Sequence, residues 1–258
     1  MSDWLFDLGN SRFKFAPLQG TLAGDVQAMP HGAEAMDAVA LDALPHGDTA
    51  YVASVASPAL TDAVVAALRA RFGALRLVAT QAEFAGVRIA YAHPARFGVD
   101  RFLALLAAHA HGGDVLVAGV GTALTIDLLD AGGTHLGGRI AASPTTMREA
   151  LHARASQLPA DGGDYAEFAS DTADALASGC DGAAIALIER SLRLAGERMR
   201  KIPALLLHGG GAPALLPQLP MARHRPSLVL DGLAVFAAHP HAHRLMSPAA
   251  RSGAGKPF

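Results

Sequence analysis

Two stretches of the chain, over a hundred positions apart, repeat one pattern of apolar and small polar residues. In the first, an apolar strand over residues 3–8 leads into a turn of small residues and a returning strand over 12–17. In the second, an apolar run over 115–129 is divided by Gly121 and Thr122. Glycine tightens such a turn without a Cβ clash, so each stretch predicts a β-hairpin. The repetition predicts a fold in which one plan occurs twice.

Between the two hairpins, the apolar spacing alternates between strand and helix patterns. Residues 50–55 form a short apolar run that is typical of a buried strand. Ser57 and the proline after it suit the start of a helix, and residues 75–79 predict the next strand. A further helix is expected over 100–111, because Gly112 follows it as a helix-ending residue. Strand, helix and strand in succession indicate an α/β fold.

The second half of the chain is expected to be mainly helical after its hairpin. The predicted helices lie over 144–158, over 172–200 with one interruption near Gly179 to Gly182, and over 231–239. Short strands are predicted over 205–207 and 228–230. The remaining segments are expected to be loops over 18–48 and 159–171, and a disordered tail from residue 247.

The length and the repeated plan favour two domains. The chain has 258 residues, 51% of them hydrophobic, which is ample material for two cores. We expect an N-terminal domain over residues 1–113, a C-terminal domain over 114–246 and the tail over 247–258.

Charge and composition exclude several classes of partner and location. A formal net charge of −2 argues against nucleic acid or an anionic membrane as the main partner. The single cysteine, Cys180, cannot form an internal disulfide, which indicates a reducing compartment. The chain shows no signal-peptide pattern and no stretch of about 18 uninterrupted apolar residues. We therefore expect a cytoplasmic protein.

The two hairpin turns have the chemistry of a phosphate site. Backbone N–H groups in such turns point outward together and form a nest for anions. Ser11 and Thr122 add hydroxyl donors, and Lys14 adds a positive charge. Asp7 suits such a site only if Mg²⁺ lies between it and the phosphates. Two facing turns of this kind could clamp one nucleoside triphosphate, although either turn alone is also an ordinary hairpin.

Three further charged residues have both a functional and a structural interpretation. Asp100 begins a predicted helix, so it is either an N-cap or a carboxylate that takes a proton from an acceptor hydroxyl. Arg101 either holds a carboxylate by two hydrogen bonds or forms a surface ion pair. Asp127 lies within a strand, where aspartate is disfavoured. It is either part of a polar edge or a residue near the metal or nucleotide.

Four motifs in order carry a resemblance to a known family. They are Asp7-x-Gly9-Asn10-Ser11-x-x-Lys14, Gly98-x-Asp100-Arg101, Gly121-Thr122-Ala123-x-Thr125-x-Asp127 and Gly137-Gly138-x-Ile140. Together they resemble the type III pantothenate kinases, closely over residues 7–140 and more loosely beyond. The resemblance implies two ribonuclease H-like α/β domains of the acetate kinase–sugar kinase–Hsc70–actin superfamily. It also implies ATP-dependent phosphorylation of pantothenate, the first step of coenzyme A synthesis, by a homodimer.

The resemblance also assigns roles to residues. The ATP-binding residues it implies are Asp7, Leu8, Gly9, Asn10, Ser11, Arg12, Phe13 and Lys14, with Thr122 as the second phosphate contact. The pantothenate-binding residues it implies are Tyr91, Gly98, Val99, Asp100, Arg101 and Thr172. Asp100 is the implied catalytic base. Asp7 is implied to make an indirect contact with the Mg²⁺ that accompanies ATP.

The chain departs from the family pattern at two places. The family usually has aspartate before the Gly-Thr-Ala turn, where it binds a monovalent cation such as K⁺ or NH₄⁺, but this chain has Gly119. The Pro-Gly pair that usually follows Gly-Gly-x-Ile is also displaced, with Ala142 and Ser143 before Pro144. The first departure places the cation site in doubt, and the second places the shape of that loop in doubt.

Two other functions remain open at this point. The chain could be a regulatory or accessory protein that keeps the nucleotide fold without efficient catalysis, which the glycine at 119 would suit. It could also be a kinase for another small alcohol on the same fold. The presence of Asp7, Asp100 and Arg101 favours the pantothenate kinase.

Overall fold

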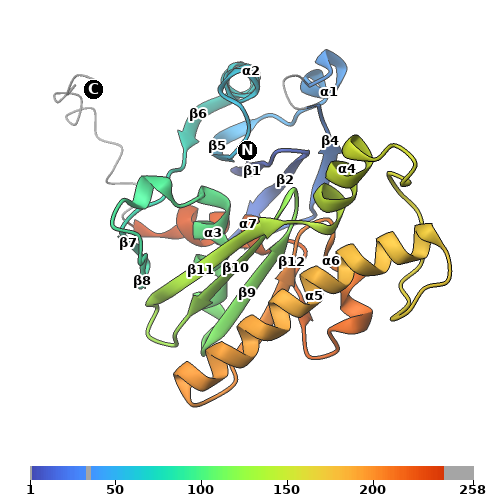
Figure 1. Ribbon diagram of the computed structural model, residues 1–258. Helices are drawn as coiled ribbons and strands as arrows, with labels where there is room; N and C mark the ends of the chain where they lie inside the picture. The colour runs from blue at the N-terminus through green and yellow to red at the C-terminus, as the bar shows by residue number, and fades with distance from the viewer. Residues whose placement is uncertain (1, 33–35, 241–258) are drawn as a thin grey trace, which may run out of the picture.

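The computed structural model describes residues 2–32 and 36–240, which form two β-sheets with helices between and around them (Figure 1). The first sheet has six strands in the order β3-β2-β1-β5-β6, and β4 also pairs with β2. Its strands are β1 (Trp4–Leu8), β2 (Arg12–Gln19), β3 (Leu22–Ala23), β4 (Gln27–Pro30), β5 (Gly47–Ser54) and β6 (Phe72–Leu77).

The second sheet repeats the plan of the first. It has five strands in the order β11-β10-β9-β12-β13. Their bounds are β9 (Val115–Val120), β10 (Ala123–Leu129), β11 (His135–Ala142), β12 (Ala204–His208) and β13 (Arg223–His224). In each sheet an antiparallel hairpin (β1–β2 or β9–β10) is extended by two parallel strands (β5 and β6, or β12 and β13). The expected twofold repetition is therefore confirmed.

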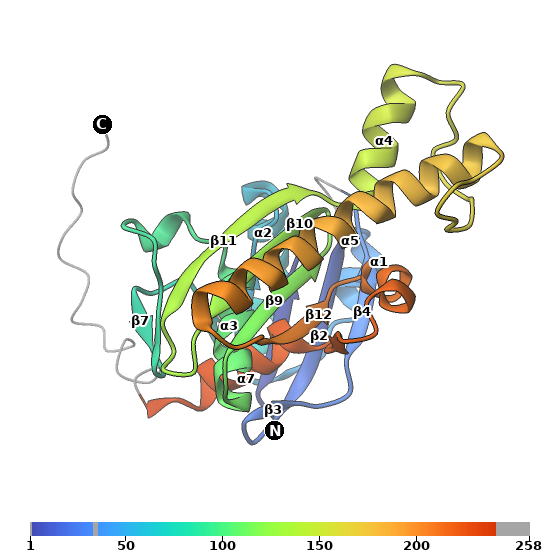
Figure 2. The same cartoon turned by 60° about the horizontal axis from the view of Figure 1, so that its bottom comes forward.

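Helices separate the two sheets and cover their outer faces (Figures 1 and 2). The helices are α1 (Ala38–Asp42), α2 (Pro58–Arg69), α3 (Val99–His111), α4 (Pro144–Arg154), α5 (Thr172–Met199), α6 (Ala212–Leu215) and α7 (Leu228–Ala238). Smaller elements are the β7–β8 hairpin (Glu83–Phe84 and Val87–Arg88) and two 3₁₀ turns (Pro94–Arg96 and Leu216–Gln218).

The central core joins both halves of the chain. Its side chains come from α3 and α7 and from the facing sides of both sheets, for example Leu5, Val117 and Leu206. The helices α3 and α7 pack so closely that a Cβ on Gly232 of α7 would lie 1.8 Å from the carbonyl oxygen of Leu103 in α3. Two separate cores lie outside, one between α2 and the first sheet and one between α5 and the second. The division at residues 113 and 114 stays a prediction.

Three expectations about single elements were wrong. The helix α5 runs without interruption through Gly179 and Gly182, because its apolar residues keep one buried face and a glycine within a helix costs only about 1 kcal/mol. The apolar run at 228–230 begins α7 instead of forming a strand, since a short run does not distinguish the two. The supposed loop over 18–48 contains β3, β4 and α1.

Other local expectations were confirmed. Ser57 caps α2 by accepting a hydrogen bond from Leu60 N–H at 3.3 Å, and α3 ends at Gly112, whose φ of 77° favours glycine. The expected tail from residue 247 lies outside the described residues. None of the described helices is long and apolar enough to cross a membrane.

Candidate active site

The polar residues of interest lie on the facing sides of the two sheets. Side chains alternate along a strand, so every second residue faces the same way. Leu5 and Ala16 of the first sheet point into the central core, and Asp7 and Lys14 lie two positions from them on the same side. Val117 and Leu206 of the second sheet point into the same core, so Gly119 and His208 face it as well. On the facing sides of both sheets, the apolar side chains of the core are thus followed two residues later by polar ones.

The two predicted phosphate turns face each other across this space. The hydroxyls of Ser11 and Thr122 are 3.1 Å apart, although 111 positions separate them in the sequence. Within the first turn, Gly9 N–H donates to the carbonyl of Arg12 at 3.1 Å. Within the second, Gly121 N–H donates to the carbonyl of Ala123 at 3.0 Å. The expectation that the turns face each other is confirmed, and both hydroxyls are exposed.

A third turn, over residues 208–211, lies against the other two. Gly209 has a φ of 95°, and a Cβ on it would lie 2.3 Å from the carbonyl oxygen of Val120. Gly211 N–H donates to that carbonyl at 3.0 Å. A Cβ on Gly210 would lie 3.2 Å from the guanidinium of Arg12 in the first turn. Glycine is therefore required where this turn approaches the second turn most closely.

The helix α4 supports the second turn. Its N-cap Ser143 accepts a hydrogen bond from Thr146 N–H at 3.3 Å, and Pro144 takes the first helical position. Thr146 donates from its hydroxyl to the carbonyl of Thr122 at 2.6 Å. The displaced proline therefore starts a helix that holds the turn.

Asp7 and Lys14 pair across the first hairpin, beneath its turn. Burial raises the pKa of Asp7 to about 7; the positive charge of Lys14 opposes this rise, and the negative charge of Asp100 adds to it. The coupling of Asp7 to both residues means that the start of α3 and the first turn border one space. A buried carboxylate with a raised pKa is a common feature of functional sites.

Asp100 lies in the first turn of α3 but is not its N-cap. The cap is Gly98, and a Cβ on it would lie 2.6 Å from a carboxylate oxygen of Asp100. That oxygen accepts a hydrogen bond from Arg101 N–H at 2.8 Å. Burial raises the pKa of the Asp100 carboxyl, whereas the Arg101 N–H and guanidinium act to lower it. The structural interpretation of Asp100 as a cap was therefore wrong.

Arg101 forms a buried ion pair with Asp127, not a surface one. Its Nε and Nη2 atoms donate to the two carboxylate oxygens of Asp127 at 2.8 and 2.6 Å. His135 lies beside them, with Nε2 at 3.0 Å from one Asp127 oxygen. Ala90 N–H donates to Nδ1 of the same ring at 3.4 Å, so Nε2 is the ring nitrogen that donates to Asp127.

This pairing changes the expected role of Arg101. The two donors that would grip a substrate carboxylate already hold Asp127. The outer Nη1 atom donates to the hydroxyl of Tyr91 at 3.4 Å, and the guanidinium lies 4.4 Å above the ring centroid of Phe97. Asp127 is thus neither a polar edge nor free to bind a metal. It fixes the orientation of Arg101 beside Asp100.

Thr172 is the one predicted site residue that the structure places apart from the others. It is exposed at the first position of α5, where Asp171 caps the helix through hydrogen bonds from Ala173 N–H and Asp174 N–H. Both views place this end of α5 beside α4, at the far end of the molecule from α3 (Figures 1 and 2). Within one subunit, Thr172 does not meet Tyr91 or Arg101.

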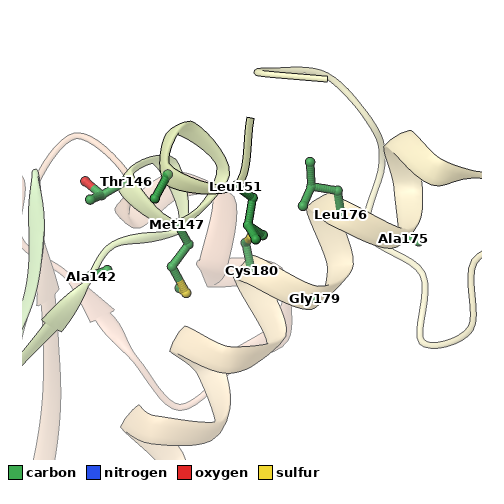
Figure 3. A pocket seen from close by; sticks show the side chains of 9 residues that line it. Ala142, Thr146, Met147, Leu151, Ala175, Leu176, Gly179 and Cys180 are labelled. Carbon is green, nitrogen blue, oxygen red and sulfur yellow. The ribbon is translucent and has the colours of Figure 1, made fainter. Parts of the chain in front are cut away.

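An apolar pocket of about 430 Å³ lies between α4 and α5 (Figure 3). Met147 and Leu151 line it from α4, and Leu176 and Cys180 line it from α5. Burial raises the pKa of the Cys180 thiol, the reverse of the shift that activates a cysteine. The pocket contains none of the residues of the turns or of the start of α3.

Among the described residues, no group of three or more His, Cys, Asp or Glu side chains could hold a metal ion. Asp7 suits Mg²⁺ bound mainly by phosphate oxygens and water, which is the usual arrangement beside a nucleotide. A monovalent-cation site next to the second turn does not fit. Gly119 provides no carboxylate, and a side chain there would meet the His208 imidazole at 2.8 Å.

Two residues of the site were missed by sequence reasoning. The predicted strand over 205–207 stops before His208, and none of the four motifs contains His135. A buried strand ending in His-Gly-Gly-Gly repeats the apolar-strand and small-residue-turn pattern of the other two turns, and this was the available signal for His208. No signal in the sequence indicates that His135 pairs with Asp127.

The family model and the sequence relatives agree on one family. The family model "Type III pantothenate kinase" matches residues 4–193. A relative from Stenotrophomonas maltophilia (strain R551-3) that carries this name is 70% identical over 239 residues, covering 93% of this chain and 98% of the relative. Among solved structures, a protein described as a Baf family transcriptional activator from Campylobacter jejuni aligns with a TM-score of 0.60 at 18% identity, covering 89% of this chain and 94% of that one.

A second solved structure supports the fold. A protein described as a 2-dehydro-3-deoxygalactonokinase from Sinorhizobium meliloti aligns with a TM-score of 0.53 at 16% identity, covering 95% of this chain and 99% of that one. At such identities the likeness concerns the fold alone. The two mixed sheets and these neighbours show an α/β fold with one plan repeated, as expected.

Proposed function

The chain belongs to the type III pantothenate kinases, and from this premise we propose that the space between its two sheets is where ATP phosphorylates pantothenate. The protein is a pantothenate kinase, which carries out the first step of coenzyme A synthesis. The main observation in favour of this location is that the hydroxyls of Ser11 and Thr122, from two equivalent turns, lie 3.1 Å apart. Asp7, Lys14 and Asp100 lie close to the same turns.

ATP is bound by the two facing turns. The backbone N–H groups of Asn10 and Ser11 and the hydroxyls of Ser11 and Thr122 donate to the phosphate oxygens. Lys14 supplies positive charge from beneath the first turn, and Arg12 supplies it from the side of the third turn. Asp7 would hold the Mg²⁺ that accompanies ATP, and the ion would supply positive charge that offsets the charge of the phosphates.

Pantothenate lies against the start of α3. The Asp100 carboxylate orients the hydroxyl of pantothenate and accepts its proton as the oxygen attacks the γ-phosphorus of ATP. The bond from the γ-phosphorus to the bridging oxygen breaks in the same step, and ADP leaves with that oxygen. The N–H groups of Arg101 that Asp127 leaves free, together with the Tyr91 hydroxyl, bind the pantothenate carboxylate. The Arg101–Asp127–His135 cluster holds Arg101 rigidly, so little conformational freedom is lost on binding.

ATP turnover that depends on pantothenate tests this assignment directly. Release of ADP should require pantothenate, and mass spectrometry should find one added phosphoryl group per ADP released. A kinase for another alcohol would release ADP with that alcohol and not with pantothenate. A regulatory protein would bind ATP without turnover. ATP and pantothenate are cytoplasmic metabolites, so we place the enzyme in the cytoplasm.

Activity should be nearly independent of the monovalent cation. Gly119 lacks a carboxylate, and backbone carbonyls bring no net charge to offset an ion. A carboxylate 4 Å from a cation contributes about 4 kcal/mol at an effective dielectric constant of 20, and that contribution is missing here. The rate should therefore change less than about twofold when K⁺ or NH₄⁺ replaces Na⁺ at constant ionic strength. Strong, saturable activation by K⁺ would contradict this, and Asp127 could not explain it because Arg101 and His135 occupy its oxygens.

The enzyme should be a twofold homodimer in which Thr172 approaches the pantothenate site of the neighbouring subunit. The end of the molecule formed by α4 and the start of α5 exposes apolar side chains, with Phe168 at 99% and Leu151 at 43% exposure. Light scattering at micromolar protein should give twice the chain mass of 26.5 kDa. Phe168→Asp should shift the mass toward the monomer, whereas Leu22→Asp, at another exposed apolar residue, should not. A monomeric wild type would refute the proposal.

A further inference from the structure

His208 is placed unusually for a residue at the end of a strand. It pairs in register with Gly119 of the neighbouring strand β9, and both face the space between the sheets. A Cβ built on Gly119 would lie 2.8 Å from Nε2 and 3.0 Å from Cε1 of His208. The same point lies 2.8 Å from the hydroxyl of Thr125 on β10. The imidazole therefore lies across Gly119 toward Thr125, in space that any other residue at 119 would fill.

The ring lies among groups that bind anions. His208 is the first residue of the third turn, whose Gly210 lies against the Arg12 guanidinium. Lys14 is close enough to influence its charge. Burial lowers the pKa of His208 to about 4, and Lys14 and His224 lower it further while Asp127 opposes them. The imidazole is therefore neutral near pH 7 and has one N–H to donate.

No partner for that N–H is found within residues 2–32 and 36–240, where the His208 ring forms no hydrogen bond. His208 is half-buried, and neither ring nitrogen is among the described buried atoms that lack a hydrogen-bond partner, so solvent reaches the ring. A donor that meets water in the free protein can exchange that water for an acceptor on a ligand that enters the space. The acceptors that the proposed function brings into this space are the oxygens of the nucleotide phosphates.

We propose that His208 is a nucleotide-binding residue whose imidazole N–H donates a hydrogen bond to the phosphates of ATP, from space that Gly119 leaves open. This inference rests on the proposed function, because it takes the nucleotide to lie between the two sheets. It assigns a specific role to the glycine at 119, which is to admit the imidazole. It also makes the third turn part of the site.

Two substitutions separate hydrogen bonding from packing. His208→Gln keeps an N–H donor near the position of Nε2, whereas His208→Leu fills similar space without a donor. Calorimetry with a non-hydrolysable ATP analogue should give an affinity for the Gln variant within about threefold of wild type. The Leu variant should bind about tenfold more weakly, the cost of losing one hydrogen bond to a charged group. The KM for pantothenate and the melting temperature should be unchanged in both. Equal ATP affinities for Gln and Leu would overturn the proposal.

The dependence of His208 on Gly119 gives a second, independent measurement. Gly119→Ala should displace the imidazole and weaken the ATP analogue about as much as His208→Ala does. Because the Thr125 hydroxyl also lies 2.8 Å from that point, all three variants are made in a Thr125→Ala background. There the double variant should bind no more weakly than His208→Ala alone, because the added methyl group has room once the imidazole is gone. Additive losses would show that Gly119→Ala acts on something other than the imidazole, and would overturn the pairing of the two residues.

Lys14→Ala, measured in the same way, distinguishes failure of this inference from failure of the proposed function. If Lys14→Ala weakens the ATP analogue and His208→Leu does not, the nucleotide binds here without His208 and only the inference fails. If neither variant changes the affinity, the nucleotide does not bind between these turns, and both proposals fail.

Discussion

Asp100→Asn should lower kcat by about two to four orders of magnitude, the usual contribution of a positioned general base. Asparagine matches aspartate in shape, and its side-chain oxygen still accepts the Arg101 N–H bond that is 2.8 Å long in the wild type. It cannot accept the proton of the pantothenate hydroxyl. The KM for pantothenate should therefore change far less than kcat, as for an interaction made mainly in the transition state.

The fold should tolerate this change. Burial raises the pKa of Asp100 above its ordinary value, so above that raised pKa its negative charge opposes folding. Neutral asparagine removes this penalty, and the melting temperature near pH 7 should not fall. Asp62→Asn, on the exposed side of α2, is the matched control and should leave both kcat and stability unchanged. A near-normal kcat for Asp100→Asn would remove Asp100 from the mechanism.

Asp127→Ala should cause the largest loss of stability among single changes at the site. Arg101 is only 6% exposed, and this substitution removes the carboxylate partner of its guanidinium. Breaking a buried pair by removing one member typically costs about 3–5 kcal/mol, because the remaining charge is buried without compensation. Urea unfolding should show this loss, and the affinity for pantothenate should fall because Arg101 is no longer held in place.

Two control variants test the cause of that loss. Asp42→Ala breaks a pair with Arg71 in which the Asp42 side chain is 83% exposed, and it should cost less than about 1 kcal/mol. Replacing Arg101 and Asp127 together by leucine should cost less than Asp127→Ala alone, since no unpaired charge remains. If Asp127→Ala were as mild as Asp42→Ala, the pair would contribute little to the fold.

The fold and the two phosphate turns could be predicted because their signals are local. Glycine and small polar residues between apolar runs define each turn, and the repetition of that pattern predicts two similar sheets. The contact of Ser11 with Thr122 then follows from the symmetry of the fold. In the same way, Ser57 and Gly112 mark helix ends through interactions within a few residues of themselves.

The pairing around Arg101 could not be predicted, because it depends on how distant elements pack. Arg101, Asp127 and His135 come from α3, β10 and β11, and their meeting depends on strand register and helix position together. The sequence left Arg101 and Asp127 each with two interpretations. The structure instead pairs the two residues with each other in a buried ion pair, which neither interpretation included. His208 was missed for a related reason, since its position above Gly119 depends on the pairing of β9 with β12.

The position of α7 has a consequence for how the protein is made. This helix, from the end of the described chain, packs on β1, β2, β3 and β5 of the first sheet and against α3. A ribosome completes the strands of that sheet by residue 77, but α7 emerges only after residue 238. At roughly 5–20 residues per second, the inner face of the first sheet waits on the order of ten seconds for this helix. The first sheet therefore cannot bury its inner face until α7 has been made. The central core forms only near the end of translation.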